Sequence, residues 1–215
     1  MVKAHLTTRD VPVEVEHATL LFIDVQNFCA TAGGGEWQGR DPAEVEAEVG
    51  WFFREMKERC VPAMQRLQAG ARTAGIEVMY TVICNLTQDG RDRSLDYKIT
   101  GFNVPPGSWD AQVIAELSPG EDEIVLPKSS SNVFVSTHID YLLRNLGTRY
   151  LLIAGNVTDQ CVEGAVRDAC DLGYLVTLVT DACCTYSAER HENSLKAIRG
   201  YCRQRTVDQV LAEIG

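Results

Sequence analysis

The chain has 215 residues, of which 45% are hydrophobic, and a formal net charge of -10. This length and apolar content suit one hydrophobic core, so we expect a single domain spanning residues 1–215. With 30 acidic against 20 basic residues and no long basic run, the surface has no electrostatic attraction for nucleic acid or anionic lipid. A small molecule is therefore the expected partner.

The opening segment MVKAHLTTRDVPVEVEH lacks the apolar core of a signal peptide, and no apolar run approaches the roughly 20 residues that span a bilayer. The 8 cysteines are spread along the chain, without the C-x-x-C spacing of zinc and redox sites. We expect mostly reduced, buried thiols. These features place the protein in the cytoplasm, with no membrane partner.

The predicted elements alternate between strands and helices along the chain. Apolar runs without polar alternation predict strands buried on both faces, and amphipathic stretches between helix start and stop signals predict helices. In chain order, we expect a strand at Ala18–Ile23, a helix at Pro42–Ala74 that Pro62 kinks or splits, strands at Ile76–Ile83 and Glu123–Leu126, a helix at Thr137–Leu146, a strand at Tyr150–Ala154, a helix at Cys161–Leu172, a strand at Leu175–Val179, and helices at Ser187–Gly200 and Val207–Ile214.

This alternation predicts an α/β fold, an open and doubly wound parallel sheet between two layers of helices. Ligands of such sheets bind outside the carboxyl ends of the strands. Three reactive side chains stand at such positions: Asp24 follows the first strand, Lys128 follows the strand that Pro127 ends, and Cys161 begins the helix after the Tyr150–Ala154 strand.

These three side chains could together carry out nucleophilic chemistry. A helix start favours the thiolate of Cys161 and offers N–H groups to a developing oxyanion. Asp24 could take the thiol proton and return it to a leaving nitrogen, while Lys128 would stabilise both anions. Taken singly, each has an ordinary structural role, as a buried thiol, a helix cap or a solvated lysine. Their coincidence at one sheet edge favours a catalytic site.

Three segments carry a resemblance to a known family. The segments LLFIDVQNF, DEIVLPKSSSNVF and LLIAGNVTDQCVEGAVRDACDLGYLVTLVTDAC resemble the first strand, the lysine segment and the nucleophile segment of the isochorismatase-like hydrolases. Together they cover most of the chain from residue 18 onward. The G-x-x-T-x-x-C-V element at residues 155–162 is the most specific of these motifs.

The resemblance implies a three-layer fold around a six-stranded parallel sheet, and a catalytic triad of Asp24, Lys128 and Cys161. It also implies a cis peptide between Asn156 and Val157, and an oxyanion hole formed by the backbone N–H groups of Val157 and Cys161. The family's habit further implies a homo-oligomer, a dimer or a tetramer. The long amphipathic stretch adds slightly to this expectation, because its side chains offer apolar surface at Val49, Phe52, Phe53, Met56 and Cys60.

Other sites are less well supported. The glycine run at residues 33–35 is not followed by the Lys-Ser or Lys-Thr of a phosphate loop and is expected to form a flexible rim, and there is no G-x-S-x-G serine motif. Cys183 and Cys184 follow a strand without a base nearby, so we interpret them as structural. The histidines lack metal-binding spacing, and a Cys–His pair with His138 or His191 stays open as an alternative; the set is His5, His17, His138 and His191. We expect neither a metal nor a cofactor.

The family resemblance also narrows the reaction. Its nicotinamidases add a metal site built around Asp-x-His, whereas no histidine lies between Asp24 and Lys128. Its vinyl-ether isochorismatases can lack the cysteine that this chain keeps at residue 161. The expected activity is therefore hydrolysis of a small amide, N-carbamoyl or ureido compound. A nicotinamidase-like activity and an isochorismatase-type cleavage of a vinyl ether are the alternatives. A catalytically idle binding or scaffold protein is an alternative of another class.

The segment DGRDRSLDYK at residues 89–98 follows the second strand and could overhang the site. Its guanidinium groups could bind a substrate carboxylate, although a solvated loop or a subunit contact fits equally well. The expected substrate-binding residues are Phe28, Trp37, Arg91, Arg93 and Tyr97, with Glu36 and Lys98 as further candidates.

Overall fold

The computed structural model describes residues 9–215, so His5 and the first part of the opening segment lie outside the described residues. Six parallel strands form one sheet in the order β3-β2-β1-β4-β5-β6. This confirms the predicted parallel sheet and its number of strands. The strands are β1 (Ala18–Ile23), β2 (Glu77–Ile83), β3 (Ile124–Lys128), β4 (Tyr150–Asn156), β5 (Leu175–Cys184) and β6 (Arg203–Arg205).

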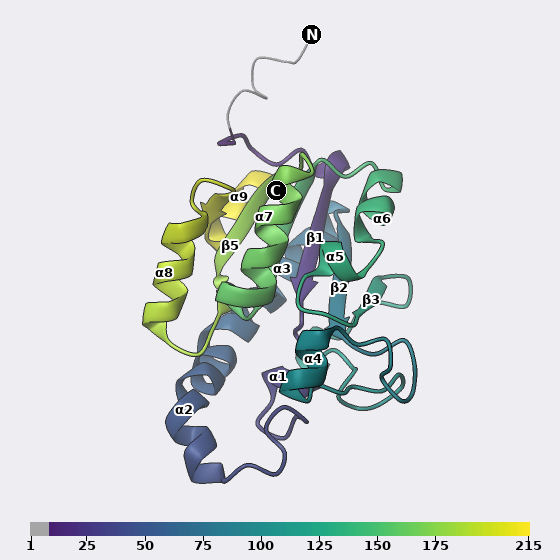
Figure 1. Ribbon diagram of the computed structural model, residues 1–215. Helices are drawn as coiled ribbons and strands as arrows, with labels where there is room; N and C mark the ends of the chain where they lie inside the picture. Colours follow the sequence, from purple (N-terminus) through teal and green to yellow (C-terminus); the bar gives the residue numbers. More distant parts are fainter. Residues whose placement is uncertain (1–8) are drawn as a thin grey trace.

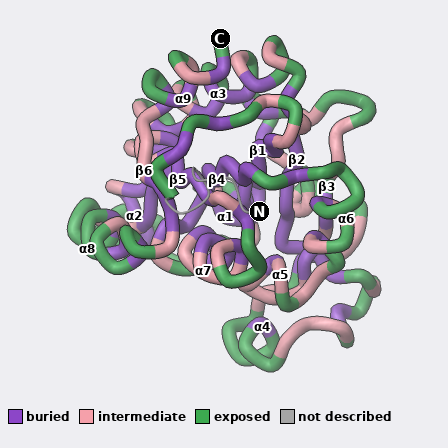
Figure 2. Tube along the Cα trace, turned by 90° about the horizontal axis from the view of Figure 1, so that it is seen from above, coloured by how far each residue is buried: buried purple, intermediate pink, exposed green. Residues whose placement is uncertain are grey.

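Helices cover both faces of the sheet, which confirms the three-layer α/β/α architecture. Figure 2 shows α3 and α9 on one side of the strands and α5, α6 and α7 on the other. Within residues 9–215, none of the helices combines the length and apolar character needed to cross a membrane. The helices are α1 (Asn27–Ala30), α2 (Pro42–Glu55), α3 (Val61–Ala74), α4 (Leu95–Thr100), α5 (Val133–Ser136), α6 (Ile139–Asn145), α7 (Glu163–Asp171), α8 (Ala188–Ile198) and α9 (Val207–Ile214).

The two central strands form the middle of the core, because every residue of β1 and of β4 is buried. Burial on both faces explains why these strands read as unbroken apolar runs. The predicted strands are present, but three of them continue beyond their predicted ends: β3 to Lys128, β4 to Asn156, and β5 through Cys183 and Cys184. The family resemblance implied six strands, but the residue pattern did not locate the edge strand β6, since its sequence Arg-Gln-Arg has no apolar pattern. Arg203 nevertheless buries its guanidinium against Thr177 and Glu213.

The first long helix is interrupted just before Pro62, where a kink or split was expected. A π-helical turn at Met56–Cys60 separates α2 from α3, and Pro62 lies in the first turn of α3. The apolar side chains that were expected to offer spare surface for assembly belong instead to the chain's own core, where Val49, Phe52, Met56 and Cys60 are buried. The long helical stretch therefore gives no support to an oligomer.

The order of the strands creates a crevice between β1 and β4. The connections from β1 run to one side of the sheet and those from β4 to the other, so the strand order reverses between these neighbours. In open α/β sheets such a point is where ligands bind. In Figure 1 the loops after β1 and β2, together with α1 and α4, lie at the lower end of the sheet.

Gly155 holds the two central strands together at this end. Its φ is 126°, and a Cβ there would lie 2.2 Å from the carbonyl oxygen of Ile23. Only glycine fits such a close approach of two backbones. The residues that follow, Asp24 on one strand and Asn156 on the other, are thereby placed side by side.

Candidate active site

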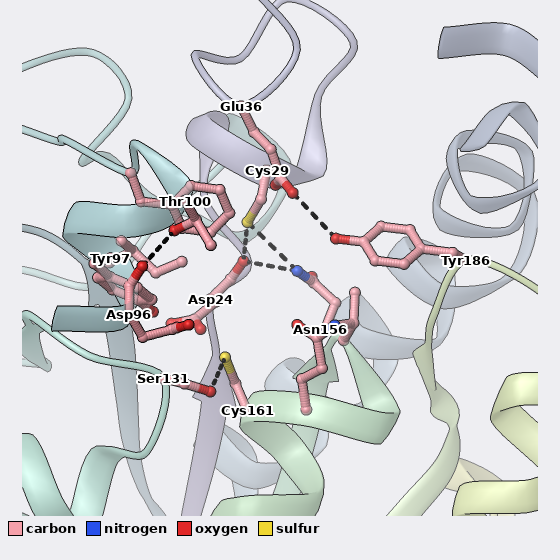
Figure 3. Close-up of a pocket in the computed structure, with 14 residues that line it drawn as sticks. Asp24, Cys29, Glu36, Asp96, Tyr97, Thr100, Ser131, Asn156, Cys161 and Tyr186 are labelled. Carbon is pink, nitrogen blue, oxygen red and sulfur yellow. Dashed lines mark hydrogen bonds between the residues drawn. The ribbon is translucent and has the colours of Figure 1, made fainter. Parts of the chain in front are cut away.

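A pocket of about 560 Å³ opens at the carboxyl ends of the strands. Two of the three residues predicted to be catalytic, Asp24 and Cys161, line it (Figure 3). Lys128 is not a lining residue, but its buried ammonium group contacts both of them. The residues that line it are Asp24, Cys29, Glu36, Ile83, Asp96, Tyr97, Thr100, Phe102, Ser131, Asn156, Val157, Gln160, Cys161 and Tyr186.

Asp24 directly follows β1 and adopts a left-handed backbone conformation, with φ of 53°. Aspartate tolerates this region better than most side chains. Its backbone is tied to the neighbouring strands, because its N–H donates to Thr81 and its carbonyl accepts from the Asn156 side chain at 3.0 Å. The buried carboxylate accepts from the Thr81 hydroxyl through Oδ1, at 3.2 Å, and pairs with Lys128 through Oδ2.

Lys128 is the last residue of β3, two strands away from β1 in the sheet. Its ammonium group is completely buried and lies 2.8 Å from Asp24 Oδ2. The Nζ atom also lies 3.1 Å from the Ser130 carbonyl, 3.3 Å from the Tyr97 hydroxyl and 3.6 Å from Cys161 Sγ. A buried ammonium needs this many acceptors to offset the loss of water.

Cys161 lies in a π-helical turn, Thr158–Val162, that opens the helix continued by α7. The predicted helix therefore begins with this wider turn instead of an α-helical one. The buried thiol contacts Lys128 Nζ and, at 3.4 Å, the hydroxyl of Ser131. The structure thus brings Asp24, Lys128 and Cys161 together around one point.

The charges of the three groups follow from their burial and their mutual contacts. Burial raises the pKa of Asp24, and the nearby ammonium opposes this rise. Burial alone would lower the pKa of Lys128, but the facing carboxylate and thiol raise it well above its usual value. At neutral pH this favours a Lys128–Asp24 ion pair.

The surroundings of Cys161 favour its protonated thiol form. Burial raises the pKa of Cys161 to about 11, and the adjacent Lys128 only partly reverses the rise. This differs from the expectation that a helix start would favour thiolate, because the loss of solvation outweighs the nearby positive charge. Attack by this sulfur would require a base to remove its proton, and the Asp24 carboxylate lies beside it.

The raised pKa predicts a steep pH dependence for alkylation of Cys161. Only thiolate reacts, so the rate should rise about tenfold per pH unit through the neutral range and approach a plateau near the pKa. Peptide mass spectrometry after timed iodoacetamide exposure measures this rate at Cys161 alone. Lys128→Met removes the group that lowers the pKa and should slow the reaction further. A plateau already reached at neutral pH would contradict the protonated resting state.

The peptide bond between Asn156 and Val157 is cis, as the resemblance implies. Asn156 donates to the Asp24 carbonyl and, at 3.6 Å, to the sulfur of Cys29. Val157 and Cys161 both line the pocket. That their backbone N–H groups form an oxyanion hole remains a prediction.

Of the five predicted substrate-binding residues, Tyr97 lines the pocket. Phe28 and Trp37 are buried behind the wall: Phe28 packs edge-on against Phe102, with ring centroids 5.0 Å apart, and the Trp37 indole donates to the Cys29 carbonyl at 3.2 Å. Both therefore hold the wall in place. They do not form its surface.

The two arginines do not line the pocket either. Arg91 is exposed and pairs with Asp89, while Arg93 donates to the carbonyls of Gly90 and Phe102. Each guanidinium is occupied by its own loop, which the sequence does not reveal. The structure thus places no predicted arginine where a substrate carboxylate would meet it.

The glycine run was expected to form a flexible rim, but one of its members is closely packed. A Cβ on Gly34 would lie 2.1 Å from the carbonyl oxygens of both Asn27 and Phe28. The turn formed there brings Glu36 to the pocket, where the Tyr186 hydroxyl donates to its carboxylate at 3.1 Å.

Several wall residues were not predicted. Ser131 and Tyr186 come three and two residues after their strands, so a wider use of the strand-end rule would have found them. Other wall residues, such as Asp96 and Thr100, belong to α4, a short helix that the sequence analysis did not predict. His138 and His191 are not among the lining residues. His191 instead contacts the Thr158 hydroxyl at 2.9 Å and so supports the turn that carries Cys161.

Cys183 and Cys184 are buried at the end of β5, inside the core, and do not line the pocket. Among residues 9–215, no group of three or more His, Cys, Asp or Glu side chains is arranged to hold a metal ion.

Comparison with known proteins agrees with the fold. Ureidoacrylate amidohydrolase RutB of Enterobacter sp. (strain 638) is 27% identical over 186 residues, which cover 78% of this chain and 75% of that protein. An isochorismatase family protein of Desulfovibrio vulgaris subsp. vulgaris str. Hildenborough superposes with a TM-score of 0.73 at 29% identity, covering 91% of this chain and 98% of the other. A cysteine hydrolase of Pseudomonas syringae pv. phaseolicola superposes with a TM-score of 0.78 at 21% identity, covering 95% of each chain. Residues 18–210 match the isochorismatase domain, and the chain therefore belongs to the isochorismatase family of hydrolases.

Proposed function

We propose that this hydrolase cleaves a carbon–nitrogen bond of a small amide, N-carbamoyl or ureido compound through a covalent intermediate on Cys161. The observation that carries the proposal is the buried thiol beside the Lys128–Asp24 ion pair, at the wall of a pocket large enough for a small substrate. The similarity to an amidohydrolase supports the choice of bond.

The reaction begins with proton removal. Asp24 accepts the proton of the Cys161 thiol as its sulfur attacks the substrate carbonyl, and the ion pair with Lys128 limits the cost of the charges that form. The oxygen of the tetrahedral intermediate is received by the N–H groups of Val157 and Cys161. Each such donor contributes about 2.7–4 kcal/mol to lowering the barrier.

Nitrogen leaves poorly as an anion, so Asp24 returns the proton to it as the carbon–nitrogen bond breaks. The amine or ammonia departs and leaves a thioester on Cys161, or a thiocarbamate where the substrate is ureido. A water molecule then attacks this intermediate while Asp24 again takes a proton, and the thiol is restored when the acid leaves. Lys128 remains a fixed cation through both halves.

A screen of primary amides, N-carbamoyl acids and ureido acids for release of ammonia tests the proposal. Turnover of at least one class is expected, and it should be lost after stoichiometric alkylation of Cys161. If vinyl ethers were cleaved and none of the three nitrogen classes were, the proposal would be wrong. Failure of every class, together with no protection of Cys161 from iodoacetamide by any of them, would favour a binding or scaffold role.

We expect catalysis to be independent of metal, because the sulfur, carboxylate and ammonium of the proposed mechanism supply the nucleophile, base and positive charge. Dialysis against a chelator should leave the turnover rate unchanged, as measured by ammonia release before and after. Activity that is lost on chelation and restored by added zinc would contradict this.

We also propose that the chain forms a homo-oligomer, a dimer or a tetramer, as its family resemblance implies. Apolar side chains are exposed on α4 and on α5, including Leu95, Ile99 and Val135. Multi-angle light scattering at working concentration should give a mass of two or four chains of 23.8 kDa, and a mass of one chain would refute this. All 8 cysteines are free, which supports a location in the cytoplasm, where thiols stay reduced.

A further inference from the structure

The charges on the wall of the pocket are of one sign. Three carboxylates line it, from Asp24, Glu36 and Asp96, and among the described lining residues there is no lysine, arginine or histidine. Lys128 does not change this balance, because its ammonium is fully buried and paired with Asp24. The remaining carboxylates, Glu36 and Asp96, have no cation beside them on the wall.

Glu36 lies at the end of the pocket away from the nucleophile. Figure 3 shows Glu36 and Cys161 at opposite ends of the group, with Cys29 and Asp24 between them. The carboxylate accepts one hydrogen bond, from the Tyr186 hydroxyl at 3.1 Å. The nearest arginine in sequence, Arg40, is exposed and pairs with Glu48 instead.

The setting of Glu36 is rigid. Close packing of Gly34 on the backbone of Phe28 fixes the preceding turn, and the Glu36 N–H donates to the Phe28 carbonyl. Tyr186 is held between the rings of Trp37 and Phe52, at centroid distances of 6.1 Å and 5.5 Å. A carboxylate and a phenol held in this way are preorganised to receive a ligand.

We propose that the substrate carries an ammonium or another cationic, hydrogen-bond-donating group at the end away from the scissile bond, and that Glu36 with Tyr186 receives this group. The inference rests on the proposed function and narrows its substrate class. A substrate carboxylate has no partner on the described wall and would meet Glu36 and Asp96, which repel it.

The protonation of Glu36 would respond to such a ligand, because the free carboxyl group is only partly ionised near neutral pH. Burial raises the pKa of Glu36 to about 7, and the Tyr186 hydrogen bond and Arg40 only partly reverse the rise. A carboxylate in this position is stabilised by a cation that enters the pocket.

The charge selectivity of the pocket can be measured without turnover. Aminoethyl, methyl and sulfonatoethyl methanethiosulfonate are cationic, neutral and anionic reagents. Each transfers its alkylthio group to a thiolate to form a mixed disulfide, with methanesulfinate as the leaving group. The rate at which each reagent modifies Cys161 is measured by peptide mass spectrometry. It is then divided by the rate of the same reagent with mercaptoethanol, a neutral thiol, to correct for the reagent's own reactivity. We expect the cationic reagent to react at least about tenfold faster than the anionic one, within the range for charged clefts.

The matched variants assign the effect to its residues. Glu36→Gln keeps the shape of the side chain and should reduce the cationic-to-anionic ratio several-fold, and Tyr186→Phe should reduce it less. Glu121→Gln removes the same charge from an exposed position before β3, at the other end of the sheet, and should leave the ratio unchanged. If Glu36→Gln did not fold, the cationic-to-anionic ratio would be compared between the unmodified chain and Asp96→Asn instead. A lower ratio in Asp96→Asn would then support the proposal, and an unchanged ratio would overturn it. An equal or reversed ratio in the unmodified chain overturns the proposal, and so does an unchanged ratio in Glu36→Gln.

A substrate series separates this inference from the proposed function. Three primary amides of equal length that end in ammonium, methyl or carboxylate should show the highest kcat/KM for the ammonium compound. If the reagents show the cationic preference but no amide is hydrolysed, the proposed function fails and the pocket selectivity stands. If amides are hydrolysed with the carboxylate compound preferred, the proposed function stands and this inference is overturned.

Discussion

Replacing Cys161 by serine is expected to lower kcat on the order of 10⁶-fold, the loss seen when a hydrolase loses its nucleophile. A hydroxyl in this position is a poorer nucleophile, since its proton is far harder to remove than that of a thiol. The Lys128–Asp24 ion pair and the Ser131 contact are arranged around a sulfur atom. Ammonia release from the best substrate of the screen, followed under single-turnover conditions, measures the loss.

The fold of the Cys161→Ser variant should be preserved, because the substitution changes little buried volume. Circular dichroism and the thermal midpoint check this. Cys170→Ser serves as the matched control, because Cys170 lies on α7 after the same turn and is only partly buried; it should retain full activity. Full activity in Cys161→Ser would refute the assignment of the nucleophile.

Whether a strand could be predicted from the sequence depended on how deeply it is buried. The strands β1 and β4 are buried throughout, so their sequences carry an unbroken apolar signal, and both were predicted. The edge strand β6 has polar side chains, and its place depends on ion pairs with α9 that form only in the folded chain. Local sequence contains no trace of such long-range contacts.

The candidate catalytic residues could be identified because the backbone topology places them together. A residue after a buried parallel strand lies at the sheet edge whatever its loops do, which was enough to select Asp24, Lys128 and Cys161. The pKa of the thiol was not predictable, because it depends on the depth of burial.

The residues that form the outer wall of the pocket were harder to predict, because their positions depend on the geometry of the loops. Arg91 and Arg93 were expected to face the substrate, but short-range contacts within their own loop hold both. Glu36 reaches the pocket through a turn whose close packing at Gly34 the sequence does not reveal. The carboxylates therefore lie where guanidinium groups were expected, which changes the expected charge of the substrate.

Replacing Asp24 by asparagine is expected to cost more than the roughly 10²–10⁴-fold that one general acid–base step contributes. In the proposed mechanism Asp24 takes the thiol proton, returns it to the leaving nitrogen and later activates water, so the amide removes every one of these transfers. Burial raises the pKa of Cys161 to about 11, which leaves almost no thiolate at neutral pH to react without a base. The ratio of kcat between the two proteins at neutral pH measures the effect.

The same substitution should also destabilise the protein. Lys128 would stay fully buried without its carboxylate, and breaking a buried pair in this way costs about 3–5 kcal/mol. Asp208→Asn is the matched control, since it breaks the exposed pair with Arg66 and should cost about 0–1 kcal/mol without loss of activity. Urea unfolding of the two variants gives both values.

The intermediate offers the most direct test of the two roles of Asp24. Where acyl transfer to the thiol still occurs slowly, Asp24→Asn cannot activate the water that releases the product, so the acyl-enzyme should accumulate. Acid quenching and peptide mass spectrometry should then find the acyl or carbamoyl group on the peptide that carries Cys161. Activity close to that of the unmodified enzyme would show that another group is the base. An adduct found only on the peptide with Cys183 and Cys184 would move the nucleophile to the end of β5.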